Sequence, residues 1–155
     1  METPEFTRIL SRLQKQCSKA EYCSADVFRK ALKAFDGDRE AAAKVMASLV
    51  EDRYVDDSRY AAAFAREKAS IQGWGPVKIR FQLRAKGISE EAITAALAQI
   101  EPQKADDKLE RLLQTKARSL EGDPQKRLKL LKFGLSRGYQ YDAVDAALAK
   151  LSSKR

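Results

Sequence analysis

Residues 89–100 read SEEAITAALAQI, and their apolar side chains recur at the spacing of one helix face. Ala92 lies 51 residues after Ala41 and 51 residues before Ala143, and the same apolar pattern starts at all three places. A buried stripe repeated at a fixed interval predicts a chain built from tandem units. The three apolar sets are Ala41, Ala42, Val45, Met46 and Leu49; Ala92, Ile93, Ala96, Leu97 and Ile100; and Ala143, Val144, Ala147, Leu148 and Leu151.

The beginnings of these three helices repeat as well. Each has a candidate N-cap, whose side-chain oxygen can accept a hydrogen bond from a first-turn amide, although glutamine is a poor cap. Each has an acid in its first turn and, just before the cap, a turn residue suited to ending the previous helix. These positions are, in order, Asp38, Ser89 and Gln140; Glu40, Glu91 and Asp142; and Asp36, Gly87 and Gly138.

Each unit also has room for two earlier helices. Ser24 is expected to cap a second helix, and Pro76 and Pro124 suit a first helical turn, where no amide hydrogen is needed. In the third unit, Gly134 and Leu135 suggest that the core pattern slips by one residue. The expected first helices are about 5–18, 57–71 and 103–120, and the expected second helices are about 25–35, 76–86 and 124–137.

The chain is therefore predicted to be all-α: an elongated, curved solenoid of three tandem three-helix repeats with about nine helices. The expected units are residues 1–53, 54–101 and 102–155. A length of 155 residues, of which 44% are hydrophobic, suffices to bury a core. The four prolines and seven glycines argue against a loop-rich or all-β architecture.

Several classes of function are disfavoured by composition. The chain has no histidine, the commonest general base and metal ligand. Cys17 and Cys23, its only cysteines, lack redox or zinc spacing, so reduced thiols are expected. No secretory signal or membrane-spanning run is visible. A soluble, cytoplasmic, monomeric protein without cofactor, metal, catalytic site or membrane contact is expected.

Positive charge is concentrated on the second helices. Lys and Arg number 30 against 22 acids, which gives a net charge of +8 and favours acidic partners. The second helices of units two and three carry cations with no acid between them, and could form a track for a phosphate backbone or an acidic protein groove. The candidate binding residues are Lys78, Arg80, Arg84, Lys86, Lys126, Arg127, Lys129, Lys132 and Arg137, with Arg29, Lys30 and Lys33 as secondary candidates.

The remaining motifs favour architecture over chemistry. The segment GWGP at 73–76 lacks the ending of a phosphate loop and indicates a tight corner with Trp74 between helices. Tyr54, Asp57, Gly75 and Pro76 are likewise assigned to architecture. Aromatic residues near the basic helices could stack on bases, but burial is favoured for them. They are Phe81, Phe133, Tyr139 and Tyr141.

Some of these segments resemble a known family. Residues 54–60 read YVDDSRY, residues 73–79 read GWGPVKI, residues 86–88 read KGI, and residues 136–139 read SRGY. They are similar to signature motifs of the RecX regulatory proteins. The resemblance covers nearly the whole chain and is strong in the second unit, fair in the third and weak in the first. In the first unit only Ser24 and the segment 27–32 match, and Val27 stands where the family usually has an acid.

The resemblance implies a modulator of the RecA recombinase. Members bind the RecA–DNA filament, block its extension or promote its disassembly, and so restrain recombination, DNA repair and the SOS response. They also bind single- or double-stranded DNA, and the family has no catalytic residues to carry over. The expected function is therefore that of a non-enzymatic regulator.

Two alternatives remain open. One is an independent helical-repeat protein that binds nucleic acid and has no recombinase partner. The other is an enzyme that holds a divalent ion with Asp56, Asp57, Asp106 and Asp107.

Overall fold

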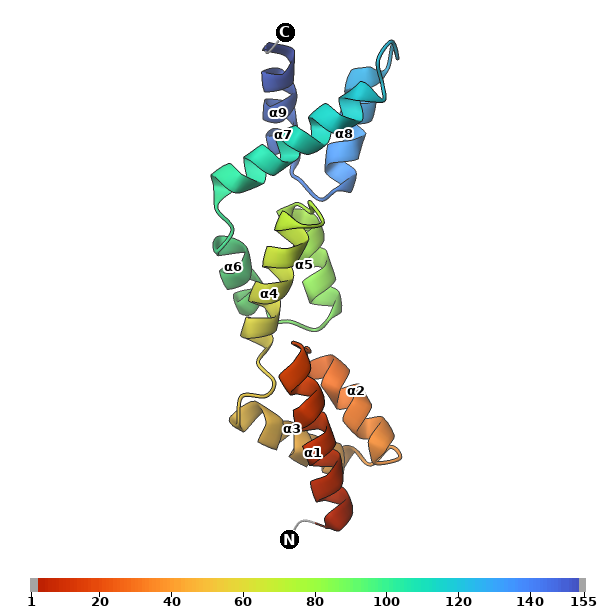
Figure 1. The fold of residues 1–155 in the computed structure, drawn as a ribbon, viewed down its shortest axis with the longest axis vertical. Coiled ribbons are helices and arrows are strands. Elements are labelled where there is room, and N and C mark those ends of the chain that lie inside the picture. Colours follow the sequence, from red (N-terminus) through yellow and green to blue (C-terminus); the bar gives the residue numbers. More distant parts are fainter. Residues whose placement is uncertain (1–2, 154–155) are drawn as a thin grey trace.

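The computed structural model describes residues 3–153, and within that range the chain forms nine α-helices and no strand (Figure 1). This confirms the predicted all-α class. The first three helices are α1 (Pro4–Lys19), α2 (Ser24–Ala34) and α3 (Arg39–Glu51). The next three are α4 (Asp57–Ser70), α5 (Pro76–Ala85) and α6 (Glu90–Ala98). The last three are α7 (Pro102–Arg118), α8 (Lys126–Ser136) and α9 (Tyr141–Ser153).

The helices form three groups stacked end to end along the long axis, which makes the molecule an elongated solenoid (Figure 1). In this view the second helix of each group, α2, α5 or α8, stands on the right side of the axis. The third helices, α3, α6 and α9, lie toward the left side. The arrangement places the three helices that carry most of the predicted binding cations on one side of the molecule.

Each group has its own hydrophobic core at the positions that the 51-residue interval predicts. Ala42, Ile93 and Val144 occupy equivalent places on α3, α6 and α9, and all three are fully buried. Ile79 and Leu83 supply the buried face of α5 in the second core. The apolar periodicity of the sequence therefore places the core correctly.

The first two cores exchange side chains across the boundary expected at residues 53 and 54. Val55, which follows that boundary, is buried in the core of α1–α3, and Tyr54 packs against the same core. Cys23, from the first group, is buried in the core of α4–α6. The division into units 1–53, 54–101 and 102–155 stays a prediction, because these groups share side chains.

Of the expected caps, Asp38 and Ser89 are confirmed, whereas the Gln140 side chain accepts no hydrogen bond from the first turn of α9 among the described residues. The side chains of Asp38, Ser89 and Asp56 accept hydrogen bonds from amides in the first turns of α3, α6 and α4. The expectation that Ser24 caps α2 is wrong, because Ser24 is already the first helical residue. The Asp57 carboxylate, from the second group, accepts both the Ser24 amide at 2.7 Å and the Ser24 hydroxyl at 2.6 Å.

The third group departs from the sequence expectation in two places. Pro124 does not open α8, which begins at Lys126 after a turn. The expected one-residue slip is also wrong, since Gly134 is buried and Leu135 is 41% exposed. A Cβ at Gly134 would lie 2.8 Å from both Val144 methyl groups, so the Val144 side chain fills the space that a larger residue would need.

Backbone contacts hold the second and third groups together. The Gly75 amide donates to the Arg137 carbonyl at 2.8 Å, and the Val77 amide donates to the Gly138 carbonyl at 2.9 Å. A Cβ at Gly75 would lie 2.5 Å from the Tyr139 amide nitrogen, which leaves no room for a side chain. The start of α5 is therefore fitted directly onto the turn between α8 and α9.

Side chains make the corresponding junction between the first and second groups. Lys86 forms an ion pair with Asp26 at 3.2 Å, and Arg59 pairs with Glu21 at 2.6 Å. Asp57 adds its two hydrogen bonds to Ser24. Lys86 and Arg137 are 51 residues apart, so both junctions use the same positions of the repeat with different chemistry.

Candidate functional site

The cations of α5 have partners inside the molecule. Arg80 and Arg84 both pair with Glu90 at the start of α6, with a distance of 2.7 Å from Arg80. The hydrogen bond from Arg84 lowers the pKa of the Glu90 carboxyl below its ordinary value, and the charge of Arg80 adds to this effect. The Lys78 ammonium lies over the Trp74 ring, 4.5 Å from the ring centre.

Three of the four cations of α8 are also opposed by acids. Lys126 pairs with Glu121 and Lys129 with Asp123, both acids lying in the turn before the helix. Lys129 and the Gln125 amide both donate to the Asp123 carboxyl, and the hydrogen bond from Lys129 is the main cause of its lowered pKa. Arg127 pairs with Asp145 on α9 at 3.0 Å. Neither α5 nor α8 contains an acid, as predicted, but acids from neighbouring segments oppose most of their cations.

Three of the predicted cations lie on α2. Arg29 pairs with Asp26, and the Lys30 ammonium lies 4.2 Å from the centre of the Tyr22 ring. Lys30 and Lys33 line a hollow of about 590 Å³ together with Arg12 of α1. The structure thus brings a third cation, absent from the sequence prediction, to the two lysines.

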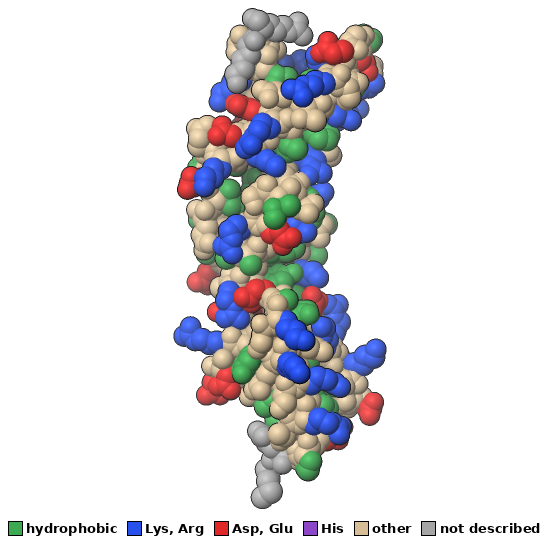
Figure 2. All heavy atoms as spheres, in the orientation of Figure 1, with side chains coloured by type: hydrophobic (Ala, Val, Ile, Leu, Met, Phe, Trp, Pro, Cys, Tyr) green, Lys and Arg blue, Asp and Glu red, His purple; other side chains and the backbone are tan. Residues whose placement is uncertain are grey.

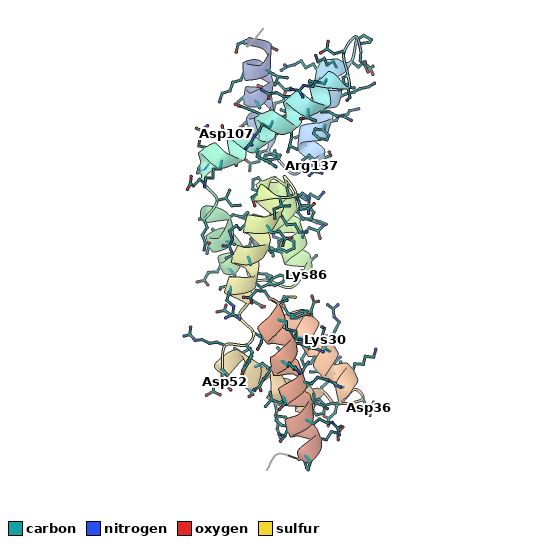
Figure 3. The ribbon with its side chains drawn as sticks, in the orientation of Figure 1. Lys30, Asp36, Asp52, Lys86, Asp107 and Arg137 are labelled. Atoms are coloured by element: carbon teal, nitrogen blue, oxygen red, sulfur yellow. The ribbon has the colours of Figure 1, made fainter. Side chains whose placement is uncertain are left out.

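Two predicted cations lie at the junctions between groups. Figure 3 shows Lys86 between α1–α3 and α4–α6, and Arg137 between α4–α6 and α7–α9. The Arg137 guanidinium donates to the Gln72 carbonyl, while its Nε is buried without a hydrogen-bond partner among the described residues. Both side chains already connect neighbouring parts of the chain.

Lys132 differs from the other cations of α8. Its side chain is exposed on the helix, and within residues 3–153 no ion pair engages it. Lys33 on α2 is similar: it is exposed, and no acid pairs with it in the described part of the chain. On the face in Figure 2, Lys and Arg side chains extend along the whole length and are interspersed with Asp and Glu.

The aromatic residues divide into two kinds. Trp74 is partly buried, packs edge-on against Phe64 and lies against the second core, as expected for a corner residue. Tyr139 is buried, and its pKa is raised by that burial. The expectation of burial is wrong for Phe81 and Tyr141, which are 68% and 56% exposed.

A cleft of about 520 Å³ between α4, α6 and α7 was not predicted. Cations from α4 and α7 line it around a floor of small apolar side chains. These cations lie outside the second helices, on which the prediction concentrated, and only the packing of α7 against α4 brings them together. They are Arg66, Lys104, Lys108 and Arg111.

The four aspartates considered for a divalent ion do not form a metal site. Asp56 caps α4, and Asp57 is bonded to Ser24. Asp106 and Asp107 lie on α7, near whose start Figure 3 labels Asp107. Among the described residues, no group of three or more His, Cys, Asp or Glu side chains could hold a metal ion. No helix in the same range is long and apolar enough to cross a bilayer.

Comparison with known proteins gives consistent results. The family model for the second three-helix domain of RecX matches residues 56–97. Regulatory protein RecX of Clostridium botulinum is 36% identical over 111 residues, which cover 69% of this chain and 51% of that protein. Regulatory protein RecX of Bacillus cytotoxicus is 29% identical over 114 residues, covering 72% of this chain and 42% of that protein. The chain thus spans about half the length of these curated relatives.

Two solved structures share the fold. The crystal structure of RecX from Lactobacillus salivarius superposes with a TM-score of 0.84 at 21% identity, over 96% of this chain and 97% of that chain. A second crystal structure, of a regulatory protein RecX, gives a TM-score of 0.85 at 24% identity, over 94% and 72%. At these identities the likeness concerns the arrangement of the helices.

Proposed function

The chain belongs to the RecX family of regulatory proteins, and on this premise we propose that it binds the filament formed by the RecA recombinase on DNA. In this proposal the protein is a non-enzymatic, monomeric, cytoplasmic regulator. It uses its basic helical-repeat surface to inhibit the extension or activity of the filament, and thereby modulates recombination and DNA repair.

The observation that carries the proposal is the position of the cations on the repeat. Lys30 and Lys33 on α2, Arg84 on α5 and Lys132 on α8 are exposed, on helices that stand on one side of the axis (Figure 1). Lys33 and Arg84 are 51 residues apart and hold equivalent positions. Cations repeated along an extended surface suit an extended polyanion, because each phosphate that they neutralise releases a counterion.

The candidate residues receive different roles in this proposal. Lys30, Lys33 and Lys132 contact the filament directly, since no acid among the described residues pairs with them. Lys86 and Arg137 act indirectly, by holding the groups in position. Lys78 lies beside Trp74 at the corner. The paired cations lie at the edge of the contact and contribute when they leave their acids in this chain for acidic groups of the filament. They are Arg29, Arg80, Arg84, Lys126, Arg127 and Lys129.

The test is inhibition of a RecA recombinase at substoichiometric concentration, measured by ATP hydrolysis and strand exchange. We expect inhibition by the wild-type chain and at least about tenfold weaker inhibition after charge reversal of Lys30, Lys33 and Lys132 to Glu. Lys44→Glu on α3 is the control, because Lys44 is exposed and lies on none of the second helices. The proposal fails if a large molar excess of the wild-type chain leaves both reactions unchanged.

Binding to naked DNA separates the regulator from an independent nucleic-acid binder. An independent binder holds naked strands tightly, with a log–log salt slope of about −0.7 per neutralised phosphate on single strands. The regulator binds the filament more tightly than the naked strand at the same salt concentration. Equal affinity for both would favour the independent binder.

A further inference from the structure

Four large apolar side chains are exposed on the outward faces of α5 and α8. Val77 and Phe81 on α5 are 50% and 68% exposed, and Leu128 and Leu135 on α8 are 46% and 41% exposed. We call these four residues the apolar stripe. Single exposed apolar residues are normal on a protein surface, but a row of them marks a contact site.

The stripe is not a misplaced part of the core. The inward face of α5 is already supplied by Ile79 and Leu83, and that of α8 by Leu130 and Gly134. Val77 and Phe81 are four residues apart, and Leu128 and Leu135 are seven apart, so each pair shares one face of its helix. The stripe therefore adds a second apolar face to helices whose cores are complete.

The two halves of the stripe are joined at the junction between groups. Leu135 lies in the last turn of α8, and its carbonyl accepts the Gly138 amide at 3.0 Å. The Gly138 carbonyl in turn accepts the Val77 amide at the start of α5. The stripe thus extends about 10 Å along α8, crosses the junction and continues about 6 Å along α5.

Equivalent positions on α2 are charged instead. Val77 and Leu128 correspond at the 51-residue interval, and the matching residue of α2 is Asp26. Phe81 corresponds to Lys30 on α2, and to Lys132 on α8. The apolar character is therefore confined to the second and third groups, while α2 presents only charge at these positions.

Cations lie between and beside the apolar side chains. Lys132 is exposed between Leu128 and Leu135, and Arg84 is exposed one turn beyond Phe81. This composition suits a protein surface with an apolar centre and acidic residues around it. DNA phosphates gain nothing from valine and leucine, and only Phe81 could stack on a base. A second copy of the chain would bring the same cations against each other.

We infer that the apolar stripe binds the protein component of the filament, and not its DNA, through an apolar patch with an acidic rim. The inference rests on the proposed function, since it assigns one part of that contact. Phe81 is the anchor, because exposed aromatic side chains carry much of the energy of protein contacts. The lysines of α2 are left to contact the nucleic acid.

The test compares the double variant Phe81→Ser/Leu128→Ser with the wild-type chain on two ligands: a naked single strand, and the recombinase filament on the same strand. We expect filament affinity to fall at least about tenfold and naked-strand affinity to change less than about twofold. Val50→Ser is the matched control, because Val50 is 51% exposed on α3, away from the stripe. Circular dichroism and thermal melting establish that each variant is folded.

Several outcomes would overturn the inference. An equal loss on both ligands would make the stripe a nucleic-acid contact, and unchanged filament binding would leave it without this role. Sedimentation showing a wild-type dimer that the double variant loses would make the occupant a second copy. Failure of the wild-type chain to bind the filament at all would instead refute the proposed function, so the two failures are distinguishable.

Discussion

Gly138 determines how closely the turn between α8 and α9 can approach α5. Its φ of +96° lies in the left-handed region, and a Cβ there would lie 2.7 Å from the Lys78 amide nitrogen and 3.1 Å from the Gly75 carbonyl oxygen. Two separate requirements, backbone conformation and space, therefore act on the same residue.

Substituting Gly138 tests the two requirements separately. Gly122 has a φ of +81° and no atom within 4 Å of its ideal Cβ, so Gly122→Ala should cost only about 1 kcal/mol of backbone strain. Gly138→Ala adds a collision with α5 and should lower the free energy of unfolding by about 3 kcal/mol or more. Urea unfolding measures both. Equal losses would mean that the two groups are not in close contact.

Glu90 is the residue that neutralises two candidate binding cations. Replacing it by Gln should release Arg80 and Arg84 and strengthen binding to the recombinase filament by about two- to fivefold at low salt. Glu91→Gln removes an acid from the neighbouring position without releasing these arginines and is the control. Unchanged or weaker binding of the Glu90 variant would show that neither arginine contacts the filament.

The same carboxyl gives a prediction for pH. The pKa of Glu90 is lowered in the folded chain. Its ion pairs therefore contribute fully to stability at pH values above the ordinary pKa of a glutamate. The contribution is lost as the pH falls through the lowered pKa. Between pH 6 and 8 the wild type should therefore be more stable than Glu90→Gln by a constant amount. This difference in stability should become smaller below about pH 4. Thermal melting across this range is the measurement.

At the scale of helices, α8 and α9 pack through a glycine that meets a branched side chain. Gly134 faces the two methyl groups of Val144, and this contact is the reason why the core pattern of α8 does not slip. The sequence shows a glycine where the first two units have a leucine, and it does not show that Val144 fills the vacated space. A local pattern lacks this information because the partner lies on another helix.

A double-mutant cycle measures that contact. Gly134→Ala should destabilise the chain by about 1–2 kcal/mol, since overpacking outweighs the better helix propensity of alanine. Val144→Ala should also destabilise, by removing buried methyl groups. The double variant should lose less stability than the two single variants lose together, because the smaller residue 144 makes room for the added methyl group. Strict additivity in chemical unfolding would contradict the contact.

Much of the helical architecture follows from the sequence alone. The positions of Ala42, Ile93 and Val144 in three cores were predictable because burial repeats with the 51-residue interval. The partners of the cations were not, since Glu90 and Asp145 act on arginines of neighbouring helices. The exposure of Phe81 was missed for a related reason: composition favours burial of an aromatic, and only packing shows that Ile79 and Leu83 already complete that face.

For the whole molecule, the two junctions should respond differently to salt. The first is joined by the side-chain pairs Lys86–Asp26 and Arg59–Glu21 together with the Asp57 hydrogen bonds, and the second by backbone hydrogen bonds of tightly fitted glycines. Salt at 1 M shortens the screening length to about 3 Å and so weakens the attraction within the partly exposed side-chain pairs, while backbone hydrogen bonds carry no net charge to screen. The first junction should therefore bend more freely, while the second keeps its geometry.

Distances between spin labels test this difference. With the two native cysteines replaced, one label pair at residues 44 and 94 spans the first junction, and a pair at residues 94 and 149 spans the second. All three positions are exposed. We expect 1 M NaCl to broaden the 44–94 distance distribution and to leave the 94–149 distribution unchanged. Equal broadening of both would contradict the assignment of different chemistry to the two junctions.

The bond between Asp57 and Ser24 has a consequence for synthesis of the chain. A ribosome synthesises α1, α2 and α3 before it makes the carboxylate, 33 residues after Ser24, that holds the first amide of α2. Val55, which fills part of the core beneath these helices, also arrives late. The earliest-made part of the protein is therefore completed only once the beginning of α4 has left the exit tunnel. A released fragment that ends at residue 53 should be far more sensitive to protease than one that ends at residue 101.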